Sequence, residues 1–585
     1  MSIVLQNVIF YPHSLELSHL YVRGNNYALL NNETIKIKAY NSIAFDTYFN
    51  FFSIEKWLRY CSLDNLYLEF SFKGNIQINL IGLDYRHTFY QYEQDLHQEI
   101  LSSDSSDKEK HHKIRIDQFN MQKVLYVSVR ANDVDSIISN VCFTTESEVV
   151  NKEYKLSCCI CTYNRQSYIQ KSADVLETGI DKNGLNMDVI ITNNGDPIQL
   201  NKEYKNIHIY KSKNMGGAGG FTHSICKAIE SNSSHVLLMD DDINFHFESL
   251  LRTYRFFQFI RPEYFDVMLA GSMFSSDERW LQYERNTILD NNGFHHQGHF
   301  QDMRDRGVAL NNTFSESIYG LSGWWFSAFS TKLIKENGLP LPIFVRGDDI
   351  EFSMRNNKEI VSLNGINVWH DPFILKYNEI MEDYYLPRNM IMNALLSYQR
   401  YYNLIKLFSL KKFIKNLITF NYVAAEFNVL ALEHVINEEY KKDPADLHQW
   451  AMKTLKELKK NTVTVSDVDY YYTEPRFHKK STKLLGIILS YLGLGTEGSS
   501  KYGFERQPIF FYGRKKVRLF NTLNRTMEEA TLQRGKSIRL AIRFVKNYIH
   551  LIRNIESYRS KLLEFREHSK ENASWDKLFS SQNEK

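Results

Sequence analysis

The sequence has few cysteines and no long hydrophobic run. Only six of its 585 residues are cysteine. These cysteines lack both the paired spacing of a zinc site and the spread of a disulfide framework, so we expect buried, reduced thiols and a cytoplasmic location. The longest apolar run, residues 484–494, is too short for a membrane span, which needs about 20 residues. We therefore expect no segment that crosses a bilayer.

A surplus of charge of either sign is also missing. The chain has 71 basic and 68 acidic residues, for a formal net charge of +3. This balance, together with the lack of a groove-reading motif, argues against a nucleic-acid partner. The first residues lack a basic region followed by a long apolar stretch, so we also expect no signal peptide. At this length, two or three globular domains are expected.

The pattern of apolar residues divides the chain into three parts. In residues 1–150, short segments such as Leu66–Phe72 alternate apolar and polar residues between clusters of Gly, Asn, Asp and Ser, which predicts a β-sandwich or jelly-roll domain. In residues 151–395, apolar strands alternate with helical segments, which predicts a Rossmann-like α/β domain with a largely parallel sheet. In residues 396–585, apolar residues recur every three or four positions, as at Ile538 and Ile542. This spacing predicts a helical C-terminal domain.

The strand predicted at Val236–Met239 is followed directly by three aspartates, Asp240, Asp241 and Asp242. Alternate residues on an extended segment face the same way, so Asp240 and Asp242 can share one ion. Carboxylate oxygens suit Mg²⁺ or Mn²⁺, and such an ion commonly bridges the protein to a diphosphate. Taken alone, the run fits an acidic turn equally well.

Polar segments follow the other predicted strands. Thr162–Arg165 and Asn193–Asp196 each follow a strand, at the edge where open α/β sheets bind ligands. Between them and the aspartates lies Asn214–Phe221, with four glycines that let backbone approach a ligand and open a helix. The segment lacks the ending of a P-loop and the spacing of a dinucleotide fingerprint, which disfavours ATP hydrolysis and NAD chemistry.

Three further features each have a functional and a structural explanation. Trp324 and Trp325 are adjacent, and indole faces stack on sugars, although core packing explains them equally well. Asp348 and Asp349 can supply a general base, or Asp348 can cap a helix in a capping box with Glu351. A neutral His370 is a sound third ligand for Mn²⁺, although a single histidine is often structural.

In this order, these motifs resemble glycosyltransferase family 2, and more narrowly the polymerising galactofuranosyltransferases of the mycobacterial cell-wall type. The resemblance implies a GT-A fold in the central domain, a metal-dependent inverting displacement and Asp349 as the catalytic base. It implies a metal site of three residues: Asp240, Asp242 and His370. It implies a donor site of six residues: Thr162, Arg165, Asp196, Asn214, Gly217 and Asp241. It implies an acceptor site of four residues: Trp324, Trp325, Asp348 and Glu284.

The implied reaction moves galactofuranose from UDP-galactofuranose to a hydroxyl of a lipid-linked surface glycan. Two alternatives stay open: a different UDP-sugar donor with the same mechanism, and a non-catalytic glycan-binding or assembly protein. The basic clusters at Arg514–Arg518 and Lys411-Lys412 suggest peripheral contact with the inner face of the membrane, and solvated helix faces explain them equally well. A homo-oligomer is a further partner hypothesis.

Overall fold

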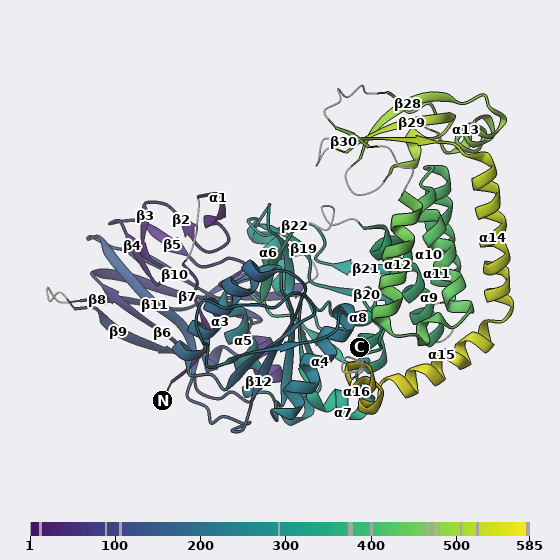
Figure 1. Cartoon of the computed structure of the whole chain (residues 1–585). Coiled ribbons are helices and arrows are strands. Elements are labelled where there is room, and N and C mark those ends of the chain that lie inside the picture. The colour runs from purple at the N-terminus through teal and green to yellow at the C-terminus, as the bar shows by residue number, and fades with distance from the viewer. Residues whose placement is uncertain are drawn as a thin grey trace.

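The computed structural model shows three regions that follow one another along the chain (Figure 1). Antiparallel sheets at the N-terminus lead into a central α/β region, and a helical region with a small sheet of its own follows. The structure describes residues 2–10, 15–87, 90–103, 108–290, 293–371, 378–397, 402–459, 464–466, 473–477, 479–502, 506–521 and 526–580.

The N-terminal region consists of two antiparallel sheets. The first has the order β3 (Tyr27–Asn31), β4 (Thr34–Ile37), β11 (Ser136–Thr145), β6 (Leu66–Lys73) and β9 (Lys110–Arg115), with β1 (Ile3–Asn7) also paired to β11. The second has the order β2 (Arg23–Gly24), β5 (Ser42–Ala44), β10 (Val124–Ala131), β7 (Asn75–His87) and β8 (Tyr90–Ser102). Two short helices accompany them, α1 (Leu15–Ser18) and α2 (Ile54–Tyr60). Buried and half-buried residues alternate along β6, so its apolar face points into the core. The β-rich N-terminal region is confirmed, and its jelly-roll connectivity stays a prediction.

The central sheet is mixed rather than largely parallel. Its order is β14 (Ile207–Lys211), β13 (Met187–Asn193), β12 (Leu156–Thr162), β15 (His235–Asp240), β24 (Phe326–Ser330), β17 (Met268–Ala270), β25 (Glu359–Val361) and β23 (Ile318–Tyr319). The first four strands run parallel, as the alternation of strands and helices predicts, whereas β24 pairs antiparallel with both β15 and β17. The helices of this region are α3 (Gln166–Asn183), α4 (Gly216–Glu230), α5 (Phe247–Gln258), α6 (Arg306–Thr313), α7 (Thr331–Asn337) and α8 (Asp348–Asn356).

A second sheet of the central region lies beyond the end of β15. Its order is β16 (Ile243–Phe245), β26 (Asn367–His370), β18 (Ser272–Ser275), β19 (Leu281–Glu284) and β22 (Gln301–Asp302). A separate hairpin is formed by β20 (Asn286–Asp290) and β21 (Gly293–Gln297). Because β16 begins one residue after Asp242, this second sheet continues directly from the acidic run.

The C-terminal region is helical, as predicted, but it also contains a sheet. Its helices are α9 (Leu386–Leu396), α10 (Tyr402–Ile418), α11 (Tyr422–Ile436), α12 (Pro444–Lys459), α13 (Lys480–Leu492), α14 (Arg534–Arg553), α15 (Ile555–Ser569) and α16 (Asn572–Ser580). The unexpected sheet has the order β27 (Thr464–Ser466), β30 (Thr526–Thr531), β29 (Arg514–Asn521) and β28 (Thr496–Tyr502). The sequence did not predict strand β29, because this segment is rich in basic residues. Its only buried apolar residues are Val517 and Leu519. No helix among the described residues is long and apolar enough to span a membrane.

The last helix returns to the central region (Figure 1). Helices α14 and α15 carry the chain back to α16, which lies beside α7. Trp575 on α16 is fully buried and belongs to the same apolar core as Phe221 and Trp324. Its indole Nε1 donates to the carbonyl oxygen of Pro340 at 3.0 Å. The C-terminus therefore completes the core beneath the central sheet.

We expect Trp575→Ala to lower the free energy of unfolding by about 3–5 kcal/mol, because it leaves a large cavity in that core. Chemical denaturation followed by far-ultraviolet circular dichroism measures the change. Lys577→Ala, on the exposed side of the same helix, is the matched control and should shift stability by less than about 0.5 kcal/mol. Equal effects of the two substitutions would contradict this role of Trp575.

Candidate active site

The site begins where three neighbouring parallel strands end at the same level. Thr162 at the end of β12 is in register with Asn193 of β13, and Cys161 is in register with Asp240 of β15. The polar segments that follow these strands therefore start side by side. This is the edge at which open α/β sheets bind ligands.

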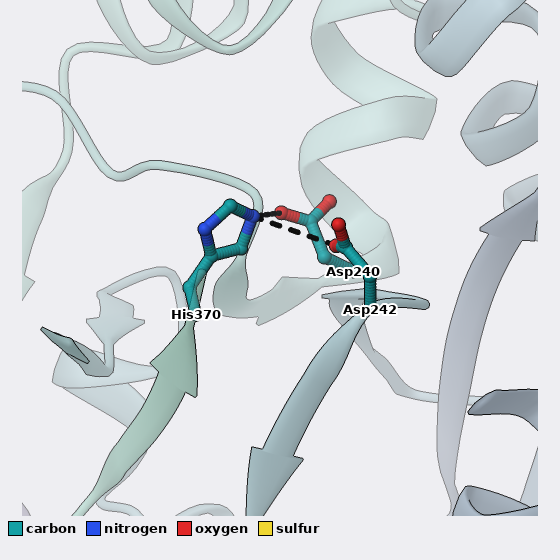
Figure 2. A group of neighbouring side chains, drawn as sticks. All are labelled: Asp240, Asp242 and His370. Carbon is teal, nitrogen blue, oxygen red and sulfur yellow. Dashed lines mark ion pairs between the residues drawn. The ribbon is translucent and has the colours of Figure 1, made fainter. Parts of the chain in front are cut away.

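Asp240, Asp242 and His370 form a cluster that could hold a metal ion (Figure 2). One ligand atom from each lies within 4.8 Å of the others. Strand pairing explains the convergence, since Ile243 of β16 pairs with His370 of β26 and so sets Asp242 beside the imidazole. The Nε2 of His370 lies 3.4 Å from Asp242 Oδ1 and 4.0 Å from Asp240 Oδ2.

The imidazole of His370 is oriented by its other nitrogen. Its Nδ1 lies 2.6 Å from the carbonyl oxygen of Asp371 and donates to it, which leaves Nε2 facing the two carboxylates. Asp242 and His370 are buried, whereas the Asp240 side chain is 36% exposed. Two carboxylates and a neutral imidazole suit Mn²⁺, and this donor set also accepts Mg²⁺ through its oxygens.

Asp241, between the two ligands, has different partners. Its Oδ2 accepts a hydrogen bond of 2.6 Å from Thr162 Oγ1, and its Oδ1 accepts one of 2.7 Å from Arg165 Nη1. The same guanidinium nitrogen lies 2.6 Å from Asp242 Oδ2. Burial raises the pKa of Asp241, and the charge of Arg165 opposes that rise. Arg165 thus neutralises part of the acidic run while holding Asp241 apart from the metal cluster.

Hydrogen bonds join the segments expected to bind the donor. The backbone N–H of Asp196 donates to Asn164 Oδ1 at 2.8 Å, which ties the loop after β13 to the loop after β12. Asn194 Nδ2 donates to the carbonyl oxygen of Gly216 at 3.0 Å, at the start of α4. Asn214 Oδ1 accepts the Gly216 N–H at 3.1 Å. Asp196 is exposed, so it lies at the rim of this joined surface.

The glycine-rich start of α4 packs against the segment that leads to Asp348. Gly216 has a φ of +70°, and a Cβ there would lie 2.2 Å from the carbonyl oxygen of Phe344, so only glycine fits. A Cβ on Gly217 would lie 3.5 Å from Asp348 Oδ2. The glycines therefore allow residues 214–221, which are expected to bind the donor, to lie next to Asp348 of the Asp348–Asp349 pair.

Asp348 and Asp349 occupy the first turn of α8, whose N-cap is Gly347. The alternative of an Asp348–Glu351 capping box is wrong, because Asp348 lies inside the helix and Glu351 pairs with Arg355 instead. Asp349 Oδ1 accepts the Ile350 N–H at 2.8 Å. Both carboxylates lie at the positive end of the helix dipole, which favours negative charge.

Both carboxyl groups of this pair are harder to ionise than an ordinary aspartate. Burial raises the pKa of Asp348, and the neighbouring charge of Asp349 raises it further. Burial also raises the pKa of Asp349; the Ile350 N–H and Arg346 oppose the rise, and Glu284 adds to it. An aspartate near its ionisation point is suited to accept a proton.

Helix α9 holds the segment before α8 through two asparagines that are not among the expected site residues. Phe344, Arg346 and Gly347 all have positive φ, at 75°, 66° and 91°. Asn389 Nδ2 donates to the carbonyl oxygens of Val345 and Arg346, each at 2.8 Å, and Asn393 Nδ2 donates to that of Gly347 at 2.8 Å. Strained backbone of this kind persists only where surrounding contacts fix it. The signal in the sequence was weak: two asparagines four residues apart in a helix whose only other polar residue is Arg388.

Glu284 lies in β19 and belongs to the electrostatic surroundings of Asp349. Its Oε1 accepts a hydrogen bond from Thr287, and its Oε2 forms an ion pair with His296 Nδ1 at 3.0 Å. The hydrogen bond to Glu284 raises the pKa of His296. Thr287 and His296 were not among the expected site residues, because their contact with Glu284 depends on the β20–β21 hairpin.

The two tryptophans lie in different surroundings. Trp324 is buried, with its ring edge-on to Phe221 and Phe352, and its Nε1 has no hydrogen-bond acceptor among the described residues. Trp325 is half-buried, and its Nε1 donates to the carbonyl oxygen of Gly271 at 2.8 Å. The backbone N–H of Asp240 donates to the Trp325 carbonyl oxygen. Trp324 thus packs as a core residue, while Trp325 adjoins the metal cluster.

Comparison with known proteins gives two matches to family models. Residues 11–146 match the model described as galactofuranosyltransferase 2 N-terminal, and residues 157–316 match glycosyl transferase family 2. The chain is thus similar to glycosyltransferase family 2 over residues 157–316. Its central domain accordingly has the GT-A fold of that family, with the acidic cluster at the end of β15.

Two curated relatives of the chain are galactofuranosyltransferases named GlfT2. The protein of Mycolicibacterium smegmatis is 23% identical over 258 residues, which cover 41% of this chain and 38% of the relative. That of Mycobacterium tuberculosis is 25% identical over 203 residues, which cover 32% of this chain and 31% of the relative. The chain thus spans well under half of the length of either relative.

A solved structure, a mannosyltransferase of Pyrobaculum calidifontis with GDP-mannose and Mn²⁺, is 11% identical to this chain. The match covers 54% of this chain and 85% of that one, with a TM-score of 0.26.

We expect Asp242→Ala to weaken Mn²⁺ binding by at least about 100-fold, because it removes a buried carboxylate from a three-residue cluster. Free Mn²⁺ measured by electron paramagnetic resonance during titration gives the affinity. Asp133→Ala, exposed between β10 and β11 of the N-terminal region, is the matched control and should bind Mn²⁺ like the wild type. Unchanged affinity in Asp242→Ala would place the metal elsewhere.

Proposed function

We propose that the chain transfers galactofuranose from UDP-galactofuranose to a hydroxyl of a lipid-linked surface-glycan acceptor, with inversion at the anomeric carbon. The observation that carries the proposal is the cluster of Asp240, Asp242 and His370. It accompanies a glycine-rich segment, residues 214–221, that adjoins the Asp348–Asp349 pair. The two GlfT2 relatives support galactofuranose as the sugar. We place the reaction in the cytoplasm, at the inner face of the membrane where such an acceptor would be reached.

In this proposal the acidic cluster holds Mn²⁺ or Mg²⁺. When bound, the ion supplies positive charge that stabilises the departing diphosphate of UDP. Asp240 and Asp242 offer carboxylate oxygens, and His370 offers Nε2 because its Nδ1 is engaged by the backbone. The residues present therefore fit the ion that the reaction needs.

The remaining donor residues orient UDP beside that cluster. We assign Asp241 to the ribose, and Thr162 and Arg165 hold it through the hydrogen bonds described above. Asp196, Asn214 and Gly217 line the surface that those bonds join together. The positive end of the α4 helix dipole favours the negative charge of the phosphates.

Asp349 acts as the general base in a single displacement. Its Oδ1 is engaged by the Ile350 N–H, so we assign Oδ2 to take the proton from the acceptor hydroxyl. The acceptor oxygen then forms a bond to the anomeric carbon as the bond from that carbon to the UDP oxygen breaks. We assign Trp325, Asp348 and Glu284 to positioning the acceptor, with Trp324 supporting Trp325 from the core.

We expect Asp349→Asn to lower the rate of transfer by about 10²–10⁴-fold, the usual contribution of a positioned base. The assay follows UDP release from UDP-galactofuranose with Mn²⁺ and a galactofuranose-terminated lipid acceptor, with and without EDTA. Mn²⁺ affinity should not change, because Asp349 lies outside the metal cluster.

The same assay separates the alternatives. Turnover of another UDP-sugar but not UDP-galactofuranose would keep the mechanism and change the donor. Binding of glycan without turnover of any donor would indicate a non-catalytic glycan-binding protein. Asp133→Asn, exposed between β10 and β11 of the N-terminal region, is the matched control and should transfer like the wild type.

The pH dependence of kcat/KM tests the environment of Asp349. A base must be ionised, so the rate should rise with pH through a midpoint well above about 3.9, the ordinary pKa of an aspartate. Arg346→Gln removes a charge that lowers this pKa and should move the midpoint up. Glu284→Gln removes a charge that raises it and should move the midpoint down. Shifts in the same direction would rule out Asp349 as the titrating group.

A further inference from the structure

Helix α14 presents an apolar stripe to solvent that its packing does not use. Ile538, Ile542, Val545 and Ile549 are between 42% and 65% exposed, and their spacing of four, three and four residues sets them on one side of the helix. The opposite side carries the residues that pack into the C-terminal core: Leu540, Phe544 and Leu551. The fold therefore does not explain the outer stripe.

Helix α13 has a similar stripe next to that of α14. Its exposed residues are Leu484, Leu485, Ile488 and Leu492, and Leu494 follows just after its end. A Cβ on Gly493 would lie 2.5 Å from Arg534 Nη2, so the end of α13 touches the start of α14. The two helices meet at the outer edge of the C-terminal region (Figure 1). Of the 21 large apolar side chains that are exposed among the described residues, nine lie on these two adjoining helices or directly after α13.

The charge of this surface has one sign. Helix α14 contains six arginines and lysines and no carboxylate, and α13 contains two lysines and no carboxylate. Arg539, Lys546 and Arg553 are exposed and recur every seven residues, so they form a row along one side of the α14 stripe. Apolar residues flanked by cations are typical of helices that lie in the interface of an anionic bilayer.

We propose that the outer faces of α13 and α14 form a docking surface for an anionic lipid bilayer. The exposed isoleucines and leucines enter the boundary between headgroups and acyl chains, and the row of cations contacts the lipid phosphates. A second copy of the chain fits this surface less well, because pairing α14 with itself would oppose two rows of positive charge. The proposal does not depend on glycosyl transfer.

This surface differs from the basic clusters singled out in the sequence. Arg514 is buried and donates to the backbone carbonyls of Glu474 and Glu497. Lys516 and Arg518 both pair with Glu529. Lys412 lies 3.7 Å from the buried Asp383. Those clusters are largely engaged within the protein, whereas the cations of α14 named above are exposed.

Sedimentation of the full-length protein with vesicles tests the proposal. We expect binding to vesicles of phosphatidylcholine and phosphatidylglycerol, and weak binding to phosphatidylcholine alone. Ile542→Gln with Ile549→Gln should lower the partition coefficient by about tenfold or more. Arg539→Gln with Lys546→Gln and Arg553→Gln should abolish the preference for phosphatidylglycerol.

A matched control is Val175→Gln with Met452→Gln, which changes two exposed apolar residues on other helices and should bind like the wild type. Circular dichroism and an unchanged melting temperature would establish that each variant is folded. Full binding by both α14 variants would overturn the proposal, as would failure of the wild type to bind anionic vesicles. Concentration-dependent self-association that the isoleucine variant abolishes, without lipid binding, would assign the surface to a second copy instead.

Discussion

The structure concentrates carboxylates at one place, and their mutual repulsion is the constraint on which the site depends. Asp240, Asp241 and Asp348 all contribute to raising the pKa of the nearby Cys161 thiol, after burial, which indicates how closely they are gathered. Arg165 offsets part of this negative charge, and the helix dipole of α8 offsets more. Because its pKa is raised, Asp348 also adds less negative charge than an ordinary aspartate. A divalent cation is the natural remaining partner of so much negative charge.

The positions of these carboxylates are set by two separate segments of the chain. The aspartates after β15 follow from the register of the central sheet, which is fixed within about a hundred residues of sequence. The pair at the start of α8 depends instead on the amides of Asn389 and Asn393, which hold a backbone of unfavourable dihedral angles. The C-terminal region therefore supports the central site as well as adding surface.

Local signals in the sequence predicted much of this arrangement. Strand β6 shows its alternation directly, and the acidic run after β15 points to metal chemistry without any tertiary information. Contacts between distant segments left no such signal: the pairing of Ile243 with His370, the contact of His296 with Glu284, and the C-terminal sheet. The apolar period of α14 correctly predicted a helix, but periodicity does not distinguish a stripe that packs from one that faces solvent.

The return of α16 to the central domain has a consequence for biosynthesis. Trp575 fills the same core as Trp324, whose neighbour Trp325 accepts a hydrogen bond from Asp240 through its backbone carbonyl. A ribosome must therefore release the chain through Trp575 before that core can close. The central domain cannot reach its final packing until α16 has been made, and a transcript cut short before codon 575 yields a chain with an open core.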